Sequence, residues 1–413
     1  PVAKTVCAGG ATTFSVTAAD AGSFTYQWQL STNGGTTWAN VIPSSAGAAY
    51  SGNTTATLTL TNIQIGANNY RYRAIVTGAG CSVTSNGAAT LGVNNAPTIS
   101  SQPVVQNICV GGTATFSVTA AGTGTLSYQW QYLPNNGTHW ETLPTAPTTH
   151  VNGITSGAGT ASLTMTPSST EWHNSRLRVI VKNSNNCEVI SNVATFTVNA
   201  LPSIASQPVP RTVCVNSPTT FSVTPSGTGS FRYQWQWNKN GTTNWVDLSA
   251  DNITGSSGSF SGAGTATLSM TPANLEWHNS RLRVIVKNSN NCEVISNVAT
   301  FTVNALPTIA TQPVAKTVCA GGTTTFSVAA AGTGPFRYKW EFLANDETTW
   351  YEIPNAAITH ANGITSGGGT ATVSITPSNT GWNNSRLRVI VTNSNDCEVI
   401  SNVATFTVNA LPT

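Results

Sequence analysis

The chain has 413 residues, of which 8% are charged, and its formal net charge is +3. About 25% of the residues of an average soluble protein are charged, and a net charge this small and dispersed gives no basis for a nucleic-acid partner. No apolar run approaches the ~18 residues of a membrane-spanning helix, so we expect no membrane insertion within this segment.

One order of cysteine and tryptophan recurs along the chain. Two tryptophans and a second cysteine follow each first cysteine, in the sets Cys7, Trp28, Trp38, Cys81; Cys109, Trp130, Trp140, Cys187; Cys214, Trp235, Trp245, Cys292; and Cys319, Trp340, Trp350, Cys397. The repeat of about 105 residues has the size of one domain. We therefore predict four domains, at 1–95, 96–200, 201–305 and 306–413, with the last residues beginning a further repeat.

Alternation of apolar and polar residues predicts strands in every copy. In the second copy these strands cover 113–120, 126–133, 161–166, 175–182 and 187–198, and 168–173 has room for one short helical turn. A period of two is typical of half-buried antiparallel strands, and Gly- and Asn-rich turns separate them. Short strands with a Cys…Trp…Cys order predict an all-β chain of four tandem immunoglobulin-like antiparallel β-sandwiches.

The eight cysteines indicate disulfides and an oxidising, extracellular compartment. Free thiols and metal binding are the alternatives, and zinc ligands are usually clustered as in C-x2-C, which these cysteines are not. We expect one intradomain disulfide in each copy, which joins Cys7 to Cys81, Cys109 to Cys187, Cys214 to Cys292 and Cys319 to Cys397. Both cysteines of a copy stand beside turns, so we place the bond near one end of the sandwich, between the first and last hairpins.

The tryptophans divide into two groups. The first of each copy lies within an alternating strand, so we predict that Trp28, Trp130, Trp235 and Trp340 are core residues. The second group has two interpretations. Trp38, Trp140, Trp245 and Trp350 either pack at the edge of the core or form exposed platforms for a sugar or another subunit.

A pair of outward-facing arginines recurs on the strand that corresponds to 175–182. The pairs are Arg71 and Arg73, Arg176 and Arg178, Arg281 and Arg283, and Arg386 and Arg388. One interpretation is a polar ladder of cross-strand hydrogen bonds on a solvated sheet face. The other is a repeated weak binding face for acidic glycans or a neighbouring filament.

No set of nucleophile, base and orienting acid recurs in the copies, so we predict no catalytic residues and no enzyme activity. Three of the five histidines, His139, His150 and His173, fall in the second copy. A metal site there requires their loops to converge, and isolated surface histidines are the simpler interpretation. We predict no metal site and no cofactor.

The repeated strings Val-Cys-x-Gly-Gly, Tyr-Gln-Trp-Gln, Arg-Leu-Arg-Val-Ile-Val and Ser-Asn-Val-Ala-Thr-Phe-Thr-Val-Asn resemble the Ig-like repeats of large secreted and surface proteins of Bacteroidetes-type bacteria. That resemblance covers all four copies and implies spacer or stalk domains of adhesins and exported proteins. The first copy departs most, with Arg71-Tyr72-Arg73 in place of Arg-Leu-Arg and no tryptophan in the place of Trp172.

Short linkers that contain proline join the copies, and proline stiffens a linker, so we expect an extended rod. Residues 1–10 are identical to 313–322, which favours a segment of a longer array. The leading hypothesis is a structural extracellular rod, stalk or fibre of a bacterial surface or secreted protein that gives reach and resistance to force and proteolysis. The alternative is an adhesin whose weak glycan- or partner-binding modules act by avidity. The expected partners are other copies of the chain in a fibre, or host or environmental glycans or proteins.

Overall fold

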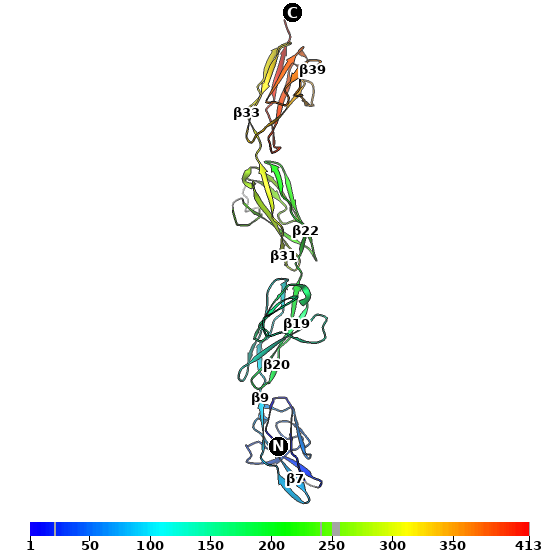
Figure 1. Ribbon diagram of the computed structural model, residues 1–413, viewed down its shortest axis with the longest axis vertical. Coiled ribbons are helices and arrows are strands. Elements are labelled where there is room, and N and C mark those ends of the chain that lie inside the picture. Colours follow the sequence, from blue (N-terminus) through cyan, green and yellow to red (C-terminus); the bar gives the residue numbers. More distant parts are fainter. Residues whose placement is uncertain (20–21, 240–241, 250–256, 413) are drawn as a thin grey trace. The chain divides into compact units, whose positions relative to one another are not determined.

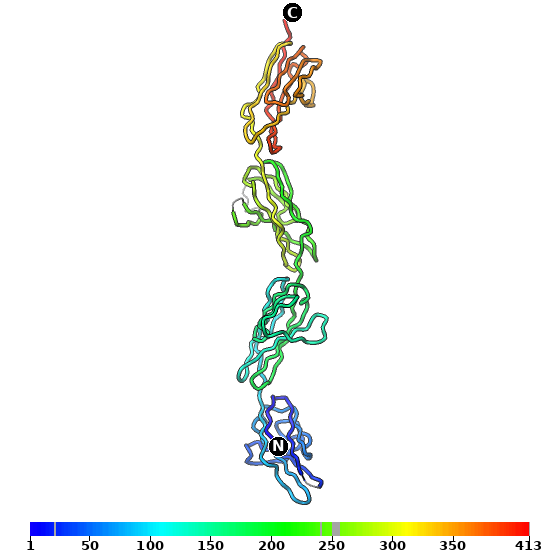
Figure 2. The backbone as a smooth tube through the Cα atoms, viewed as in Figure 1, coloured from blue at the N-terminus to red at the C-terminus, as the bar shows by residue number. Residues whose placement is uncertain are grey.

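A computed structural model describes residues 1–19, 22–239, 242–249 and 257–412. Contacts between residues divide the chain into two compact units, Pro1–Ala200 and Leu201–Thr413. Each unit contains two β-sandwiches, which can be followed by colour in Figures 1 and 2. We call them sandwich 1 (4–94), sandwich 2 (98–199), sandwich 3 (203–304) and sandwich 4 (308–409).

The first unit is built almost entirely of strands. Sandwich 1 contains β1 (Lys4–Cys7), β2 (Thr12–Ser15), β3 (Thr25–Ser31), β4 (Ala39–Asn40), β5 (Ala49–Ser51), β6 (Thr57–Thr61), the 3-10 turn η1 (Ile65–Ala67), β7 (Arg71–Gly78), β8 (Cys81–Thr84) and β9 (Ala89–Asn94). Sandwich 2 contains β10 (Thr98–Ser101), β11 (Gln106–Cys109), β12 (Ala114–Ser117), β13 (Thr119–Ala121), β14 (Ser127–Leu133), β15 (Glu141–Thr142), β16 (Thr148–His150), β17 (Gly153–Ser156), β18 (Ser162–Pro167), η2 (Thr170–Trp172), β19 (Ser175–Lys182), β20 (Glu188–Ile190) and β21 (Ala194–Asn199).

The second unit repeats this order. Sandwich 3 contains β22 (Ser203–Ser206), β23 (Arg211–Cys214), β24 (Thr219–Ser222), β25 (Thr224–Ser226), β26 (Arg232–Asn238), β27 (Val246–Asp247), β28 (Gly258–Ser261), β29 (Thr267–Pro272), η3 (Leu275–Trp277), β30 (Ser280–Lys287), β31 (Glu293–Ile295) and β32 (Ala299–Asn304). Sandwich 4 contains β33 (Thr308–Thr311), β34 (Lys316–Cys319), β35 (Thr324–Ser327), β36 (Ala329–Ala331), β37 (Arg337–Leu343), β38 (Tyr351–Glu352), β39 (Ile358–His360), β40 (Gly363–Ser366), β41 (Thr372–Pro377), η4 (Thr380–Trp382), β42 (Ser385–Thr392), β43 (Glu398–Ile400) and β44 (Ala404–Asn409).

Each sandwich has the immunoglobulin-like arrangement of a larger and a smaller sheet, and sandwiches 2, 3 and 4 each add a two-stranded sheet, β10-β13, β22-β25 and β33-β36. In sandwich 2 the larger sheet has the order β11-β21-β19-β14-β15, with β20 also paired to β19, and the smaller has the order β12-β18-β17-β16. The pairing of β11 with β21 is parallel, with Cys109 opposite Asn199, and the corresponding pair is parallel in every sandwich. The predicted antiparallel β-sandwiches are confirmed, and each also contains this one parallel pair.

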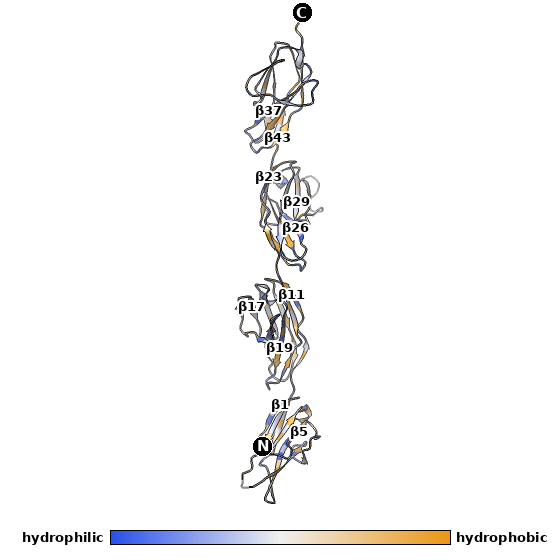
Figure 3. Cartoon of the chain, turned by 90° about the vertical axis from the view of Figure 1, so that its right-hand side faces the viewer, coloured by the Kyte–Doolittle hydropathy of each residue, from blue (hydrophilic) through white to orange (hydrophobic). Residues whose placement is uncertain are grey.

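A separate hydrophobic core lies between the two sheets of each sandwich. Its centre is the first tryptophan of the copy, and Trp28, Trp130, Trp235 and Trp340 are fully buried. The indole Nε1 of Trp130 donates a hydrogen bond to the Thr160 carbonyl at 3.0 Å, and the other three make the corresponding bond at 2.9–3.0 Å. A buried N–H that found no partner would cost free energy, so this bond fixes how the indole lies. Figure 3 shows that the strands of the sandwiches carry both apolar and polar residues.

Sandwich 1 achieves the same packing with different aromatic residues. In sandwich 2, Phe116 meets Phe196 edge-on at a centroid distance of 5.5 Å. In sandwich 1, Phe14 stacks on Tyr72 at 4.8 Å, and the Tyr72 hydroxyl is hydrogen-bonded to that of Tyr50 at 2.9 Å. Burial raises the pKa of the Tyr72 hydroxyl far above its ordinary value. Tyr72, which departs from the Arg-Leu-Arg motif, thus supplies the second ring of the aromatic pair.

The predicted strand at 175–182 coincides with β19, whose Leu177, Val179 and Val181 are fully buried. The predicted strand at 187–198 was wrong as one piece, because it divides into β20 and β21. Ser191 causes the break. Its hydroxyl accepts a hydrogen bond from the Val179 N–H at 3.0 Å and donates one to the Asn192 carbonyl at 2.8 Å, so a side chain replaces a backbone group in the ladder.

We expect Trp130→Ala to destabilise sandwich 2 by about 3–5 kcal/mol, because it leaves a large cavity and an unpaired carbonyl at Thr160. Hydrogen exchange of the peptides from 98–199 measures this loss, and the peptides of sandwich 4 serve as the internal reference. Trp140→Ala, at a half-buried tryptophan, should cost less than half as much. Equal protection of the 98–199 amides from hydrogen exchange in the two variants would contradict the central role of Trp130.

Candidate functional site

The recurrent arginines come from the central strand of the larger sheet in each sandwich: β7, β19, β30 and β42. Successive side chains of a strand point to opposite faces. The apolar residues of β19 therefore enter the core, while Arg176 and Arg178 lie on the outer face. The two arginines of a pair differ in exposure, because the first is exposed and the second is half-buried in every sandwich.

The second arginine of each pair lies over the second tryptophan of the same sandwich. The guanidinium carbon is 4.0–4.2 Å from the ring centroid in the pairs Arg73 and Trp38, Arg178 and Trp140, Arg283 and Trp245, and Arg388 and Trp350. A cation this close to an indole face is attracted by the ring quadrupole, by about 0.5–1 kcal/mol at exposed sites. We call each of these pairs, with its cross-strand partner described next, an arginine–tryptophan clamp.

A residue on the neighbouring strand accepts a hydrogen bond from the same guanidinium. Arg178 stands opposite Gln131 in the register of β14 and β19, and its Nε donates to the glutamine Oε1 at 2.9 Å. Glutamines do the same in sandwiches 1 and 3. In sandwich 4 the acceptor is the carboxylate of Glu341, at 2.8 Å, so the contact there becomes an ion pair.

The clamp brings together the two residue types that recur in the sequence. The second arginine takes part in a cross-strand ladder, and the second tryptophan is half-buried with one ring face against a guanidinium. The first arginines, Arg71, Arg176, Arg281 and Arg386, remain exposed on the same faces. An exposed guanidinium can donate paired hydrogen bonds to a carboxylate or sulfate. The Arg281 guanidinium already donates to the Asn238 Oδ1 at 2.9 Å and to the Thr242 carbonyl at 3.1 Å.

The histidines make local contacts. His173 Nδ1 lies 2.6 Å from the Val198 carbonyl, and His150 Nε2 lies 2.9 Å from the Thr155 hydroxyl, while His139 Nδ1 lies 2.8 Å from the Thr138 hydroxyl. Within the described ranges, no group of three or more His, Cys, Asp or Glu side chains is arranged to hold a metal ion. No helix in the described part of the chain has the length and apolar character needed to span a bilayer.

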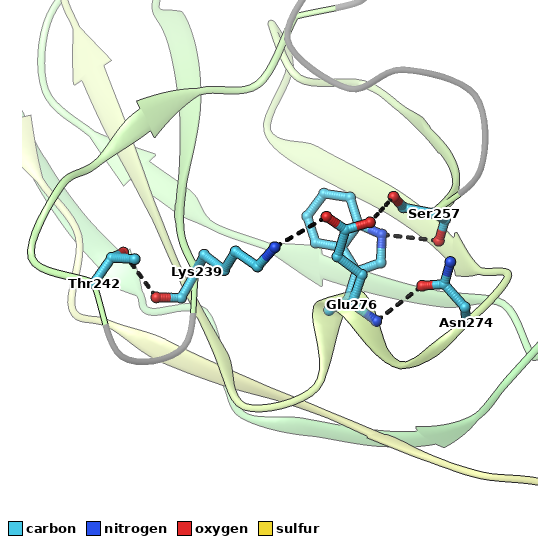
Figure 4. A network of polar contacts seen from close by, with 6 residues as sticks. Lys239, Thr242, Ser257, Asn274 and Glu276 are labelled. Atoms are coloured by element: carbon cyan, nitrogen blue, oxygen red, sulfur yellow. Dashed lines mark hydrogen bonds and ion pairs between the residues drawn. The ribbon is translucent and has the colours of Figure 1, made fainter.

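A polar network occurs beside η3 in sandwich 3 (Figure 4). The Glu276 carboxylate accepts from the Ser257 hydroxyl and forms an ion pair with Lys239 at 3.1 Å. These two donors lower the pKa of the Glu276 carboxyl from its ordinary value. Asn274 caps the turn, since its Oδ1 accepts from the Glu276 N–H at 2.8 Å. The corresponding residue is Glu171 in sandwich 2 and Gly381 in sandwich 4, so sandwich 4 has no carboxylate at this place.

The disulfides form a second recurrent feature. Cys7 of sandwich 1 is bonded to Cys187 of sandwich 2, with 5.5 Å between the Cα atoms. Cys214 of sandwich 3 is bonded to Cys397 of sandwich 4, with 5.6 Å between them. Cys109 and Cys292 are also disulfide-bonded, and the free cysteines in the described part of the chain are Cys81 and Cys319, both exposed.

The expectation of intradomain bonds, Cys7 to Cys81 and Cys319 to Cys397 among them, was therefore wrong. The cause is the parallel pairing of the first and last strands. In sandwich 2 this parallel pairing places Cys109 opposite Asn199, the last residue of β21. Cys187 lies just before β20, at the other end of the segment that β20 and β21 form. Twelve residues at about 3.3 Å each separate these ends by roughly 40 Å, and a disulfide requires Cα atoms about 4.4–6.8 Å apart.

The junction of sandwiches 1 and 2 is held by more than the disulfide. The Asn183 amide donates to the carbonyl of linker residue Asn95 at 2.8 Å, and its Oδ1 accepts from the N–H groups of Asn185 and Cys187, both at 3.0 Å. One nearly buried asparagine thus shapes the turn that carries the cysteine and binds the linker. Asn393 does the same at the junction of sandwiches 3 and 4, with the Ala305 carbonyl as acceptor at 3.0 Å.

Sequence reasoning missed this asparagine and the third tryptophans, Trp172, Trp277 and Trp382. The asparagine stands four residues before the second cysteine in three copies, and that constant spacing was the available signal. Trp172 packs against Tyr132 with a centroid distance of 4.9 Å, and its Nε1 donates to the Asn152 carbonyl at 3.2 Å. The tryptophan in the turn after β18 therefore anchors the 149–153 hairpin.

A family model described as a domain of unknown function (DUF8696) matches residues 2–95, which correspond to sandwich 1. No curated protein matches the chain. Among solved structures, an I-band fragment of titin is 15% identical with a TM-score of 0.40, covering 76% of this chain and 99% of that one. Sidekick-1 immunoglobulin domains 1-5 are 17% identical with a TM-score of 0.30, covering 99% and 79%. The insect immune protein hemolin is 12% identical with a TM-score of 0.27, covering 99% and 98%.

We expect Arg178→Met to lower the stability of sandwich 2 by about 0.5–1 kcal/mol, because it removes the cation over Trp140 and leaves Gln131 without its donor. Arg176→Met is the matched control at the exposed arginine of the same strand, and it should change stability by less than about 0.5 kcal/mol. Hydrogen exchange of the 98–199 peptides measures both. Equal losses in the two variants would contradict the clamp.

Peptide mapping of the unreduced protein should recover Cys7 linked to Cys187 and Cys214 linked to Cys397. The parallel strand register keeps the two cysteines of one sandwich a strand length apart, so no peptide should link Cys7 to Cys81. Mass spectrometry after digestion at low pH, where thiolates are scarce and exchange is slow, makes this measurement. Intradomain pairs as the main product would refute the observed register.

Proposed function

We propose that the chain is a structural segment, a rod, stalk or fibre, of a bacterial surface or secreted protein, and that its disulfides carry tension from one sandwich to the next. The observation that carries this proposal is the bond between Cys7 and Cys187, which joins two successive sandwiches. A bond inside one sandwich would protect that sandwich alone. A bond between neighbours gives the chain a second covalent connection beside the linker.

The positions of these bonds decide which residues carry a pulling force. Tension that enters at the N-terminus reaches Cys7 and passes directly to Cys187, so 8–186 lie outside the loaded path. From Cys187 the load continues along β20 and β21 into the linker. These strands are already extended at about 3.3 Å per residue, so pulling them adds little length. The bond between Cys214 and Cys397 has the same effect in the second unit.

The disulfides and the repeat motifs support an extracellular location for the chain. Disulfides persist in oxidising compartments, and six cysteines of the chain are disulfide-bonded. The resemblance of the repeat motifs to exported bacterial proteins supports a cell-surface or secreted origin. Only 8% of the residues are charged, so little electrostatic repulsion opposes lateral contact with other copies of the chain in a fibre. The short linkers that contain proline support an extended rod.

Single-molecule stretching tests the load path on a Cys81→Ser/Cys319→Ser variant held at its two ends. In the oxidised protein, unfolding of sandwich 1 should release no length, because its residues are bypassed. After reduction each sandwich should release roughly 300 Å, since an extended residue spans about 3.3–3.6 Å.

The control adds Cys7→Ser and Cys187→Ser together, which removes one bond and leaves no unpaired thiol. Unfolding of sandwich 1 should then release its full length even without a reductant. Sandwich 4 should still release none, because the bond between Cys214 and Cys397 bypasses it. Full-length steps from every sandwich in the oxidised parent would overturn the tension-bearing function.

The second candidate is an adhesin-type binding segment, favoured by one observation: an exposed first arginine recurs on the same strand of each sandwich. Each site would be weak, and repetition would add avidity. The expected ligands are acidic glycans or acidic protein surfaces. A glycan array with the parent and with an Arg71→Gln/Arg176→Gln/Arg281→Gln/Arg386→Gln variant tests it. Binding to sulfated or carboxylated glycans that the variant loses at an unchanged melting temperature would favour this candidate, and no binding by the parent would exclude it.

A further inference from the structure

The positively charged residues of the chain are almost confined to its strands. The chain has 17 lysines and arginines, and the structure describes all of them. Every one except Lys239 lies within a strand. Proteolytic cleavage of a folded protein occurs mainly in exposed loops, because a protease binds its substrate as an unpaired, extended segment. A protease that cleaves after basic residues therefore finds its target outside the strands at one position.

Strand pairing shields the other basic residues. The recurrent arginine pairs lie in β7, β19, β30 and β42, which have neighbouring strands on both sides. Arg211 begins an edge strand, but it is paired with Phe301, and its Nε donates to the Thr220 carbonyl at 3.1 Å. Lys316 is paired in the same way with Phe406. A protease can reach these residues only if the ladder beside them opens.

Lys239 differs from them in its backbone contacts. It directly follows β26, and its carbonyl accepts from the N–H of Thr242 at 3.0 Å and from the hydroxyl of Thr242 at 2.8 Å (Figure 4). Both bonds join residues three positions apart, so they can break without loss of strand pairing. The side chain of Lys239 is 52% exposed, and its ion pair with Glu276 is of the surface type that contributes little to stability.

Only sandwich 3 has a basic residue at this place. The corresponding residues of sandwiches 1, 2 and 4 are Thr32, Pro134 and Ala344. Lys239 also lies between Cys214 and Cys397, which are bonded to each other. Hydrolysis after Lys239 adds one water across the peptide bond, so that a carboxylate and an amine replace it. Cys214 then belongs to one fragment and Cys397 to the other, and their disulfide keeps both fragments in one covalent molecule.

We propose that Lys239 is the site at which a protease with an acidic specificity pocket first cuts the native chain, and that the cut leaves the two ends of the chain joined. A carboxylate in the pocket selects lysine and arginine by charge. The strands withhold the other basic residues from it, and the bond between Cys214 and Cys397 limits the effect of the cut. The inference uses a disulfide of the proposed load path but requires no tension, so the two can fail separately.

The test treats the native Cys81→Ser/Cys319→Ser protein with trypsin and stops the reaction with an inhibitor. Reduced samples should contain two fragments, 1–239 and 240–413, and unreduced samples one species with the mass of the chain plus one water. Lys239→Gln should slow the first cleavage at least about a hundredfold, because the remaining sites open only with their strands. Equal first-cleavage rates in the two proteins would overturn the proposal.

A second variant moves the site to sandwich 4 and isolates the disulfide. Ala344→Lys is added to Lys239→Gln, since the Ala344 carbonyl accepts from the Glu347 N–H at 3.2 Å, as that of Lys239 does from Thr242. Trypsin should cut this variant after residue 344, and the fragments should stay joined. Addition of Cys214→Ser and Cys397→Ser together should release them without reductant. An uncut turn, or fragments that separate while the bond is intact, would overturn the proposal.

Elastase, whose pocket takes small apolar residues, provides the control for loop access. It should cut the Lys239→Gln variant in exposed loops such as the 149–153 hairpin, where Val151 is 94% exposed. Mass spectrometry of the reduced fragments identifies each cut. Resistance of this variant to both enzymes would overturn the proposal, because general rigidity and not the placement of the basic residues would then protect the chain.

Discussion

The parallel pairing of the first and last strands of each sandwich is the constraint on which the rest of the structure depends. It places the first cysteine opposite the last residue of the sandwich, as Cys7 stands opposite Asn94. The chain leaves the sandwich at that residue, so the cysteine lies where the next sandwich begins. An antiparallel pairing would have brought the two cysteines of one copy to the same end and closed the bond within it.

Two levels of organisation follow from this arrangement. Within a sandwich, a buried tryptophan and its hydrogen bond to a threonine carbonyl orient the core. Between sandwiches, an asparagine turn binds the linker and presents a cysteine. The arginine–tryptophan clamp covers the outer face with side chains that satisfy one another, and it leaves one arginine of each pair open to the solvent. The structural proposal therefore rests on the disulfides, and the binding alternative rests on the exposed first arginines.

The sequence was sufficient to predict the central strands and the core, because alternation directly reflects which side chains are buried. The strand at 175–182 and the tryptophan at 130 are examples. Disulfide pairing was a different kind of problem. Which cysteines meet depends on strand direction at one edge of the sheet, and Val-Cys-x-Gly-Gly has the same apolar pattern in a parallel or an antiparallel pair. The spacing of Asn183 before Cys187 was visible, but its role needed the linker carbonyl that it binds.

The bond between Cys7 and Cys187 also has a consequence for which thiols can pair as the chain folds. Cys81 emerges long before Cys187 and is the first thiol that Cys7 could meet. Once sandwich 1 has folded, however, its parallel strand pair holds these two thiols at opposite ends, and a wrong bond between them cannot close. The native bond therefore requires sandwich 1 and sandwich 2 both to have formed. The folded sandwich thus discriminates between the two possible partners of Cys7 through strand direction alone.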